Sequence, residues 1–154
     1  MLMIKIMFVC HGNICRSTMA EFVMKELVRR EKLTRRFAIA SSATSREEIG
    51  RDTYIGTREK LQAEGIPFTP REAVQLTRRD YDVYDYIVAM DKENLWGIRR
   101  IVGEDTRKKV SMLLEFAGEK RGIADPWYTD DFDTAYADIC RGCKGLLETA
   151  KKRL

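Results

Sequence analysis

The feature that most constrains the fold is an N-terminal succession of a short apolar run, a polar loop and an amphipathic helical pattern. Residues 3–9 are almost continuously apolar, as expected of a strand buried on both faces of a parallel sheet. After the loop, apolar residues at positions 20, 23, 24, 27 and 28 make one helical stripe,. Thr18 and Glu21 fit a capping box near the start of this helix,. This order predicts the first strand and helix of an α/β sheet.

The rest of the chain repeats the alternation of strands and helices. Short apolar runs recur at residues 37–40 and 86–90, and helical patterns occupy residues 58–64 and 93–102. Such alternation predicts right-handed crossovers between parallel strands. The final stretch is predicted to pack across the sheet through apolar side chains on one helical face: Phe132, Tyr136, Ile139, Cys140, Cys143, Leu147 and Ala150,. We expect one α/β domain over residues 1–154, an open twisted parallel sheet of about four strands with helices on both faces.

Composition limits the partners and the compartment. The chain has 154 residues, 44% hydrophobic and 34% charged, which is enough for one compact core,. Its 28 basic and 24 acidic residues give a net charge of +4, and the basic pairs are dispersed, so we expect neither a nucleic acid nor a membrane as partner. The N-terminal apolar stretch is too short to span a bilayer and has no cleavage signal. We therefore expect a cytoplasmic protein with reduced cysteines; the sequence sets no oligomeric state.

The loop after the first apolar run has the composition of an anion cradle. Residues 10–17 read CHGNICRS and follow the carboxyl end of a strand, where loop N–H groups and a helix N-terminus bind anions. Gly12 permits close backbone approach, and Asn13 tolerates a left-handed conformation. We predict a phosphate-binding loop between the first strand and the first helix, formed by His11, Gly12, Asn13, Ile14, Cys15, Arg16 and Ser17.

Cys10 and Arg16 bracket this loop in a Cys-x5-Arg arrangement. The N–H groups and helix dipole that bind phosphate also favour the thiolate, which is the nucleophilic form of cysteine. Arg16 can hold two phosphoryl oxygens, an interaction that strengthens as charge spreads in the transition state. The Ser17 hydroxyl can donate to the sulfur. The pattern predicts a covalent thiol mechanism that needs no metal and no cofactor.

Asp125 is the candidate proton donor. A thiolate that attacks a phosphate monoester expels an alkoxide or phenoxide, which needs an acid at the leaving oxygen. Asp125 begins the sequence Asp-Pro-Trp-Tyr, in which Pro126 stiffens the backbone. Trp127 and Tyr128 supply flat apolar walls that are predicted to contact the substrate. An Asp-Pro turn leading into the final helix is the alternative interpretation.

The pattern Cys-x-Gly-Asn-x-Cys-Arg-Ser after a strand closely resembles the active-site loop of the low-molecular-weight protein tyrosine phosphatases. Residues 41–45, 85–91 and 125–128 also resemble family segments in register, so the resemblance covers essentially the whole chain. It implies hydrolysis of phosphotyrosine in proteins, and of small aryl phosphates, through a phosphocysteine intermediate. It further implies that Asp125 is the general acid and that Ser41 supports Asn13 by hydrogen bonding.

The chain departs from the family pattern at three positions. Thr18 replaces a common proline, and Thr also suits a helix start,. Arg71 stands where many members have a histidine that braces the loop through the serine matching Ser41. Arginine cannot accept a hydrogen bond, so the brace must differ here. Glu47 stands about where many members place an aromatic wall, which predicts that acidic substrates are disfavoured.

The remaining cysteines and the single histidine have other expected roles. His11 is expected to shape substrate entry without carrying protons. The resemblance suggests that Cys15 protects Cys10 through a reversible disulfide. Cys140 and Cys143 form a CxxC that could join the loop cysteines in a zinc site, but cysteines on an apolar helical stripe are ordinarily core residues,.

Three alternative functions use a similar loop. Arsenate reductases of similar fold pass the oxidised state to two cysteines in the middle of the chain, and this sequence has none between residues 16 and 139. Protein arginine phosphatases resembling this family carry threonine before the second loop cysteine, where this chain has Ile14. A non-catalytic phosphoryl-binding module would need the cradle but not both Cys10 and Asp125.

Overall fold

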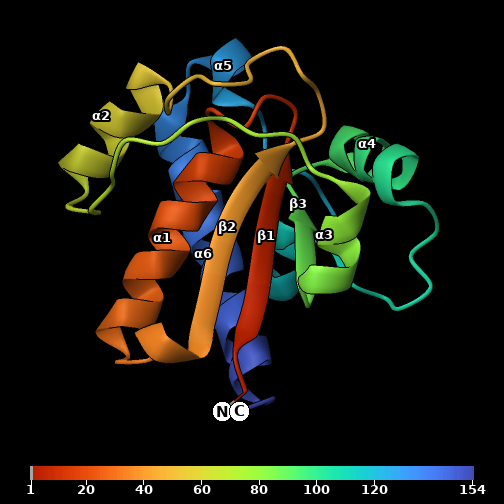
Figure 1. Cartoon of the computed structure of the whole chain (residues 1–154). Helices are drawn as coiled ribbons and strands as arrows, with labels where there is room; N and C mark the ends of the chain where they lie inside the picture. Colours follow the sequence, from red (N-terminus) through yellow and green to blue (C-terminus); the bar gives the residue numbers. More distant parts are fainter. Residues whose placement is uncertain (1) are drawn as a thin grey trace.

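The computed structural model describes residues 2–154, which form a parallel sheet between two layers of helices (Figure 1). Its strands are β1 (Ile4–Cys10), β2 (Phe37–Ala43), β3 (Tyr86–Ala89) and β4 (Val110–Met112). The α-helices are α1 (Arg16–Arg30), α2 (Ile55–Ala63), α3 (Arg78–Val83), α4 (Lys92–Val102), α5 (Pro126–Thr129) and α6 (Phe132–Lys151), with 3-10 turns η1 (Thr34–Arg36) and η2 (Leu113–Ala117). The strand order is β2-β1-β3-β4, with every pairing parallel. The predicted α/β architecture is confirmed.

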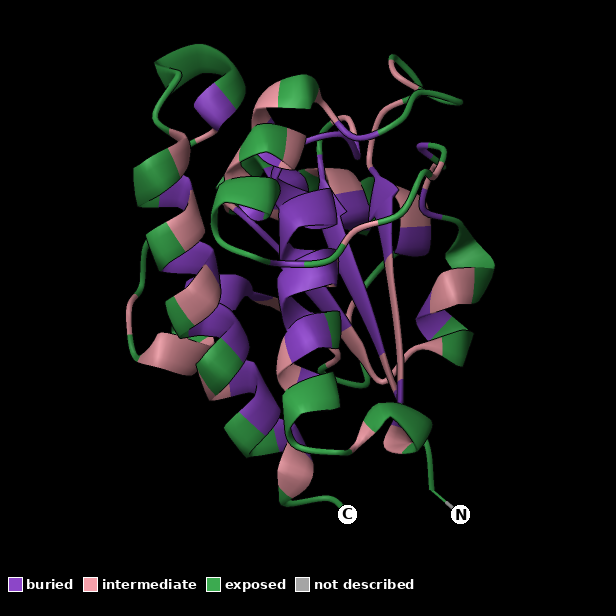
Figure 2. Cartoon of the chain, turned by 90° about the vertical axis from the view of Figure 1, so that its left-hand side faces the viewer, coloured by how far each residue is buried: buried purple, intermediate pink, exposed green. Residues whose placement is uncertain are grey.

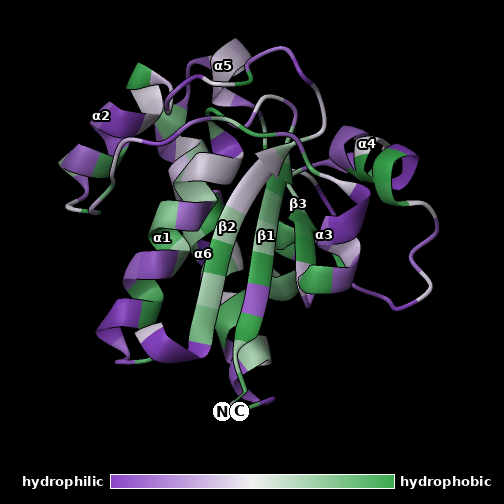
Figure 3. Ribbon diagram, viewed as in Figure 1, coloured by the Kyte–Doolittle hydropathy of each residue, from purple (hydrophilic) through white to green (hydrophobic). Residues whose placement is uncertain are grey.

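Strand β1 is buried on both faces because its alternate side chains enter two different cores. Ile6 and Phe8 belong to the core that α1 and α6 cover, while Met7 and Val9 belong to the core beneath α3 and α4. This explains why the run is continuously apolar rather than alternating. Figure 3 shows the same apolar colouring along β1 and β3 in the middle of the sheet.

The long helix α6 packs closely because it carries small residues where it meets η2. A Cβ atom at Gly145 would lie 2.0 Å from the Phe116 carbonyl oxygen, and one at Gly142 would lie 2.5 Å from Leu113 Cγ. Cys143 is fully buried, and its thiol lies 3.8 Å from the Ala20 carbonyl oxygen. Figure 2 shows the buried side of α6 turned toward the rest of the chain. The expectation that Cys143 is a core residue is confirmed, and Cys140 is half-buried beside that core.

The capping box predicted for Thr18 and Glu21 is wrong. Helix α1 begins two residues before Thr18, at Arg16, and its N-cap residue, Cys15, has no side-chain cap. Thr18 Oγ1 donates instead to the Cys15 carbonyl oxygen at 2.8 Å, and Glu21 accepts from Ser41. The helix starts early because its first residues, Arg16 and Ser17, also belong to the predicted phosphate-binding loop.

Other boundaries also differ from the sequence pattern. Strand β2 continues to Ala43, three residues past the apolar run, because it pairs with β1 as far as Cys10. Helix α2 begins at Ile55 rather than residue 58, and the fourth strand is β4, a short segment that apolar runs alone did not locate. Within residues 2–154 no helix is long and apolar enough to cross a membrane.

Candidate active site

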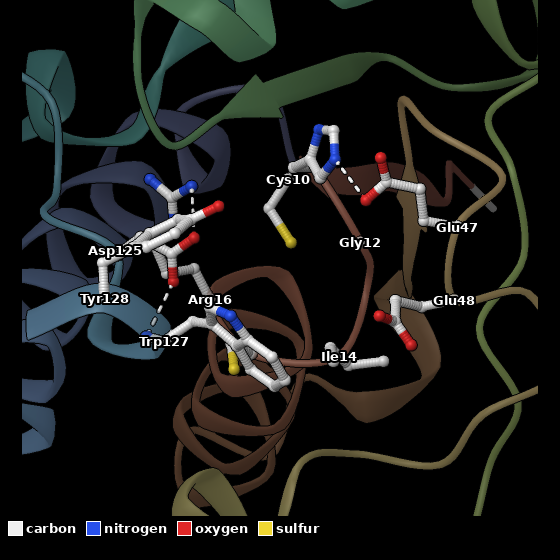
Figure 4. Close-up of a pocket in the computed structure, with 11 residues that line it drawn as sticks. Cys10, Gly12, Ile14, Arg16, Glu47, Glu48, Asp125, Trp127 and Tyr128 are labelled. Carbon is white, nitrogen blue, oxygen red and sulfur yellow. Dashed lines mark hydrogen bonds and ion pairs between the residues drawn. The ribbon is translucent and has the colours of Figure 1, made fainter. Parts of the chain in front are cut away.

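The predicted catalytic residues meet at the carboxyl edge of the sheet (Figure 4). Cys10 is the last residue of β1, Arg16 is the first residue of α1, and Asp125 is the N-cap of α5. Trp127, Tyr128 and the predicted phosphate loop border the same pocket. Its lining residues are Cys10, His11, Gly12, Ile14, Cys15, Arg16, Glu47, Glu48, Asp125, Trp127 and Tyr128.

The loop between β1 and α1 is held in a tight, left-handed turn. Asn13 is fully buried and has a φ of 58°, a conformation that asparagine tolerates better than most residues,. Backbone N–H groups from outside the loop donate to its carbonyls: Thr44 to Cys10 at 3.0 Å and Tyr54 to Ile14 at 2.8 Å. These bonds fix the backbone of the loop from outside.

Arg16 is 3% exposed, and one of its nitrogens is fixed by two acceptors. Nη1 donates to Asp91 Oδ2 at 2.6 Å and to the Ile123 carbonyl oxygen at 2.7 Å. Nη2 lies 3.5 Å from Asp125 Oδ2, and Nε is buried without a hydrogen-bond partner in residues 2–154. Burial opposes the charge, but Cys10, Asp125 and Asp91 outweigh it and raise the pKa of Arg16. On this edge Nε has no partner and Nη2 has only the long contact with Asp125; an arginine edge of this kind can hold two oxygens of an anion.

A chain of hydrogen bonds holds Asn13 from behind. Its amide oxygen accepts from Arg71 Nη2 and from the Val74 N–H, at 3.1 Å for the latter. Its amide nitrogen donates to Ser17 Oγ and Ser41 Oγ, both at 2.9 Å. Ser17 Oγ in turn lies 3.1 Å from Cys10 Sγ. Because Ser17 accepts from Asn13, its own hydrogen is free to point at a Cys10 thiolate.

Arg71 changes the direction of this brace rather than removing it. Arginine only donates, so it binds the amide oxygen of Asn13 directly, and Ser41 needs another acceptor. Glu21 supplies that acceptor, with its Oε1 2.5 Å from Ser41 Oγ. Burial lowers the pKa of Arg71, while Glu21 opposes that shift, and arginine stays charged. Arg71 and Glu21 therefore brace the loop together, one at each end of this chain of hydrogen bonds.

Cys15 differs sharply from Cys10 in its surroundings. It lines the same pocket as Cys10, and its side chain packs with Ile14, Ala73 and Tyr54. Burial raises the pKa of Cys15 to about 12, although a hydrogen bond with Thr57 opposes the shift. Cys15 is therefore a neutral thiol at physiological pH, and thiols in that form are poor nucleophiles.

The aromatic side of the pocket is supported from two other helices. Trp127 is 48% exposed and packs edge-to-face on Tyr54, with ring centroids 4.8 Å apart. Tyr54 also stacks on Phe132 of α6 at 6.1 Å. Tyr128 is 82% exposed and stands at the mouth. Asp125 Oδ1 accepts from the Trp127 N–H at 3.0 Å, so the acid and this wall are held together.

Three residues were given no role in the site by the sequence interpretation: Asp91, Tyr54 and Glu21, the last of which was expected only to cap a helix. Asp91 lies two residues after β3, at the sheet edge where β1 ends with Cys10, and that shared position was the available signal. Its other carboxylate oxygen caps α4 by accepting from the Asn94 N–H at 2.8 Å. No sequence pattern pointed to Tyr54 or Glu21, since their partners are distant in the chain.

The residues expected to lie at the mouth are found there. The His11 ring is about half exposed, and its Nε2 lies 3.0 Å from Glu47 Oε2. Glu47 and Glu48 border the pocket opposite Asp125 and Tyr128 (Figure 4). Cys140 and Cys143 lie elsewhere, on α6 against the core.

A cysteine and an arginine around a phosphate-sized loop, with a carboxylate opposite, define the class of cysteine-based phosphatases. A family model described as "Low molecular weight phosphotyrosine protein phosphatase" matches residues 5–154, and the chain belongs to that family. It is accordingly a phosphoric monoester hydrolase.

Individual relatives agree with this assignment. The chain is 36% identical over 152 residues to the low molecular weight protein-tyrosine-phosphatase YfkJ of Bacillus subtilis, covering 97% of each chain. It is 35% identical over 150 residues to the low molecular weight phosphotyrosine protein phosphatase of Homo sapiens, covering 94% of each. The crystal structure of YfkJ superimposes with a TM-score of 0.93, over 98% of this chain and 96% of that one. A Drosophila arginine phosphatase structure is similar at a TM-score of 0.87 and 28% identity, over 96% of this chain and 98% of that one.

Proposed function

We propose that this protein hydrolyses phosphotyrosine in protein substrates, and small aryl phosphates, through a phosphocysteine intermediate. The observation that carries the proposal is Arg16, a buried residue that lines the same pocket as Cys10 and Asp125 and whose Nε–Nη2 edge keeps Nε without a hydrogen-bond partner in residues 2–154. The loop N–H groups and this edge bind the phosphate dianion. The residues in place supply nucleophile, acid and charge stabilisation, so no metal or cofactor has a role in the proposed steps.

The reaction has two steps. In the first, the Cys10 thiolate attacks phosphorus, the phosphorus–oxygen bond to the phenol breaks, and Asp125 donates its proton to the leaving oxygen. In the second, the Asp125 carboxylate takes a proton from water, which attacks phosphorus and displaces the thiolate. Ser17 stabilises the thiolate by donating to Sγ, since its oxygen already accepts from Asn13.

Charge that develops on the transferring phosphoryl group is stabilised by Arg16. Its Nη1 is fixed by Asp91 and the Ile123 carbonyl, so Nε and Nη2 need little rearrangement as the transition state forms. A donor that is already in place costs no reorganisation at the moment of reaction. Asp91 acts in this proposal as a positioning residue.

Phosphotyrosine is favoured over the alternatives by the shape of the pocket. Ile14 is 8% exposed and lines it from below, and Trp127 and Tyr128 form a flat wall. An apolar floor beside aromatic rings suits a phenyl ring. Arsenate reduction needs two further thiols near the site. Cys140 and Cys143 do not supply them, because they lie on α6 against the core. We also propose a cytoplasmic location, because a catalytic thiolate must stay reduced.

The test compares variants on phosphotyrosine and phosphoarginine peptides. Cys10→Ser is expected to abolish turnover, and Asp125→Asn to slow it by roughly 10²–10⁴-fold, the usual contribution of a positioned acid. Asp130→Asn is the matched control, because Asp130 is an exposed acid five residues later in a left-handed conformation that asparagine tolerates,. Rapid quenching of the wild-type protein should trap phosphate on Cys10. Substantial activity in Cys10→Ser, or faster turnover of phosphoarginine than of phosphotyrosine, contradicts the proposal.

A further inference from the structure

The two sides of the pocket mouth carry different side chains. Figure 4 shows the aromatic wall and Asp125 on one side of the Cys10 thiol, and the Glu47 and Glu48 carboxylates on the other. A phosphotyrosine whose phosphate reaches Cys10 must pass between these sides. The peptide residues next to the tyrosine therefore come within reach of the two carboxylates.

The segment that carries Glu47 and Glu48 is fixed to the phosphate loop. The Ser45 N–H and hydroxyl both bind the His11 carbonyl oxygen, at 3.1 and 2.9 Å. The Glu47 N–H donates to Ser45 Oγ at 3.3 Å, and the Gly50 N–H donates to the Ala73 carbonyl at 2.9 Å. The backbone that carries these two glutamates is therefore held at a set place relative to Cys10.

The two carboxylates are exposed to different degrees. Glu48 lies against the loop, since a Cβ atom at Gly12 would be 3.2 Å from Glu48 Cγ, and Arg51 Nε is 3.0 Å from its Oε2. Glu47 is 68% exposed, and its partner His11 carries a charge only when protonated. Glu47 thus presents the freer negative charge to whatever lies at the mouth.

We propose that Glu47, supported by Glu48, selects phosphotyrosine sites that have basic residues on one side of the tyrosine and disfavours acidic ones. The inference rests on the proposed function and names its substrate class. An arginine or lysine beside the phosphotyrosine gains an ion pair at the mouth, and an acidic residue meets like charge. Exposed charges of this kind are screened by salt, so the selection weakens as ionic strength rises.

Other charges surround the mouth and restrict the effect to one side of the peptide. Beyond Tyr128 and Asp125 a second hollow is lined by Lys92 and Lys120, together with Glu93 and Arg121. Arg121 is already paired with Asp138. Because charges of both signs line this hollow, the two sides of a substrate peptide must be varied separately.

The test measures kcat/KM on four phosphotyrosine peptides. Each has two arginines or two glutamates on one side of the tyrosine, N-terminal or C-terminal, and alanines elsewhere. On one side the arginine peptide is expected to be preferred by about tenfold at low salt, the combined effect of gaining one exposed ion pair and avoiding one repulsion. This preference should fall several-fold in Glu47→Gln and further in the double variant Glu47→Gln/Glu48→Gln. In the wild-type protein it should also fall in about 0.5 M salt.

Glu59→Gln is the matched control, because Glu59 is an exposed glutamate on α2 outside the pocket; it should keep the wild-type ratio. The ratio of two peptides for one variant cancels any general loss of activity. The proposal is overturned if neither side prefers arginine, or if the preference survives in the double variant. A phosphotyrosine peptide flanked only by alanines tests the proposed phosphatase activity separately from the charge selection. If the protein does not hydrolyse this peptide, the proposed activity is contradicted and the charge selection is not the cause.

Discussion

At the scale of single residues, the direction of each hydrogen bond behind the phosphate loop follows from its two ends. Arg71 can only donate and Glu21 can only accept, so the Asn13 amide between them has one favourable orientation,. That orientation turns its NH2 group toward Ser17, and leaves the Ser17 hydrogen for the sulfur. A charged pair outside the pocket thus sets the polarity of a bond to the proposed nucleophile.

Arg71 is predicted to affect turnover without touching substrate. Arg71→Leu removes a charged donor to Asn13, an interaction typically worth about 1.5–3 kcal/mol, so kcat should fall roughly tenfold to a hundredfold. Arg71→Lys keeps a donor and should retain more activity. The rate at which iodoacetamide alkylates Cys10 at neutral pH should fall in parallel with kcat. Arg79→Gln, an exposed arginine on α3, serves as the control, and equal rates in Arg71→Leu and Arg79→Gln contradict the prediction.

Cys15 is predicted to protect Cys10 during oxidation. Cys15 lines the same pocket as Cys10, although burial raises the pKa of its thiol to about 12 and slows its reaction,. A sulfenic acid on Cys10 can condense with this thiol and stop before irreversible oxidation. Activity lost to peroxide should return with dithiothreitol in the wild-type protein and in Cys140→Ser, but not in Cys15→Ser. Full recovery in Cys15→Ser removes the protective role.

At the scale of helices and strands, apolar patterns predicted the elements that lie in the cores and misjudged those that end at the site. The strand prediction stopped at residue 40, because Ser41 and Ser42 are polar although buried. They are buried because this end of β2 borders the phosphate loop. Strand β4 has three residues, too few for any periodicity. The capping signal at Thr18 failed because the loop, not a side chain, sets where α1 begins.

The contact between α6 and η2 gives a prediction about stability. Glycine to alanine in a helix ordinarily stabilises it by up to about 1 kcal/mol. At Gly145 a Cβ would lie 2.0 Å from the Phe116 carbonyl oxygen, so the backbones must separate, and overpacking of this kind costs about 1–3 kcal/mol. Gly145→Ala should therefore lower the free energy of unfolding in urea titrations. Lys144→Ala, on the exposed side of the same helix, should leave it nearly unchanged; a more stable Gly145→Ala would show that the contact can relax.

At the scale of the whole molecule, the site joins residues that only the fold brings together. Cys10 and Arg16 share one short motif, and the aromatic neighbours of Asp125 together with the family resemblance favoured it over nearby acids, so these three could be predicted from sequence. The roles of Asp91 and Glu21 depend on distances across 75 and 20 residues of chain, which no local pattern encodes. The sequence singled out Arg71 as a change in the brace of the loop, but only the structure shows that it binds the amide oxygen of Asn13.

One buried carboxylate links α6 to the segment that holds Arg16. Asp138 is 3% exposed and accepts from Arg121 at 3.1 and 3.0 Å and from Arg141 at 2.8 Å. Burial would raise the pKa of Asp138, but the two arginines outweigh it and the pKa is lowered. Arg121 lies two residues before Ile123, whose carbonyl binds Arg16. Loss of this carboxylate therefore acts on stability and on the site together.

The pH dependence of unfolding tests this link. A carboxyl whose folded pKa lies below its unfolded value near 3.9 stabilises the fold above that value, and loses the contribution as pH falls through the folded pKa. Asp138→Asn should lower the unfolding free energy by about 1–2 kcal/mol at pH 7, a figure reduced because both arginines are half exposed,. The difference from wild type should shrink below about pH 4, where the wild-type carboxyl also protonates. Asp130→Asn, at an exposed aspartate in a left-handed conformation that asparagine tolerates, is the comparison, and a wild-type difference that stays constant down to pH 2 rules out the ion pair as its cause.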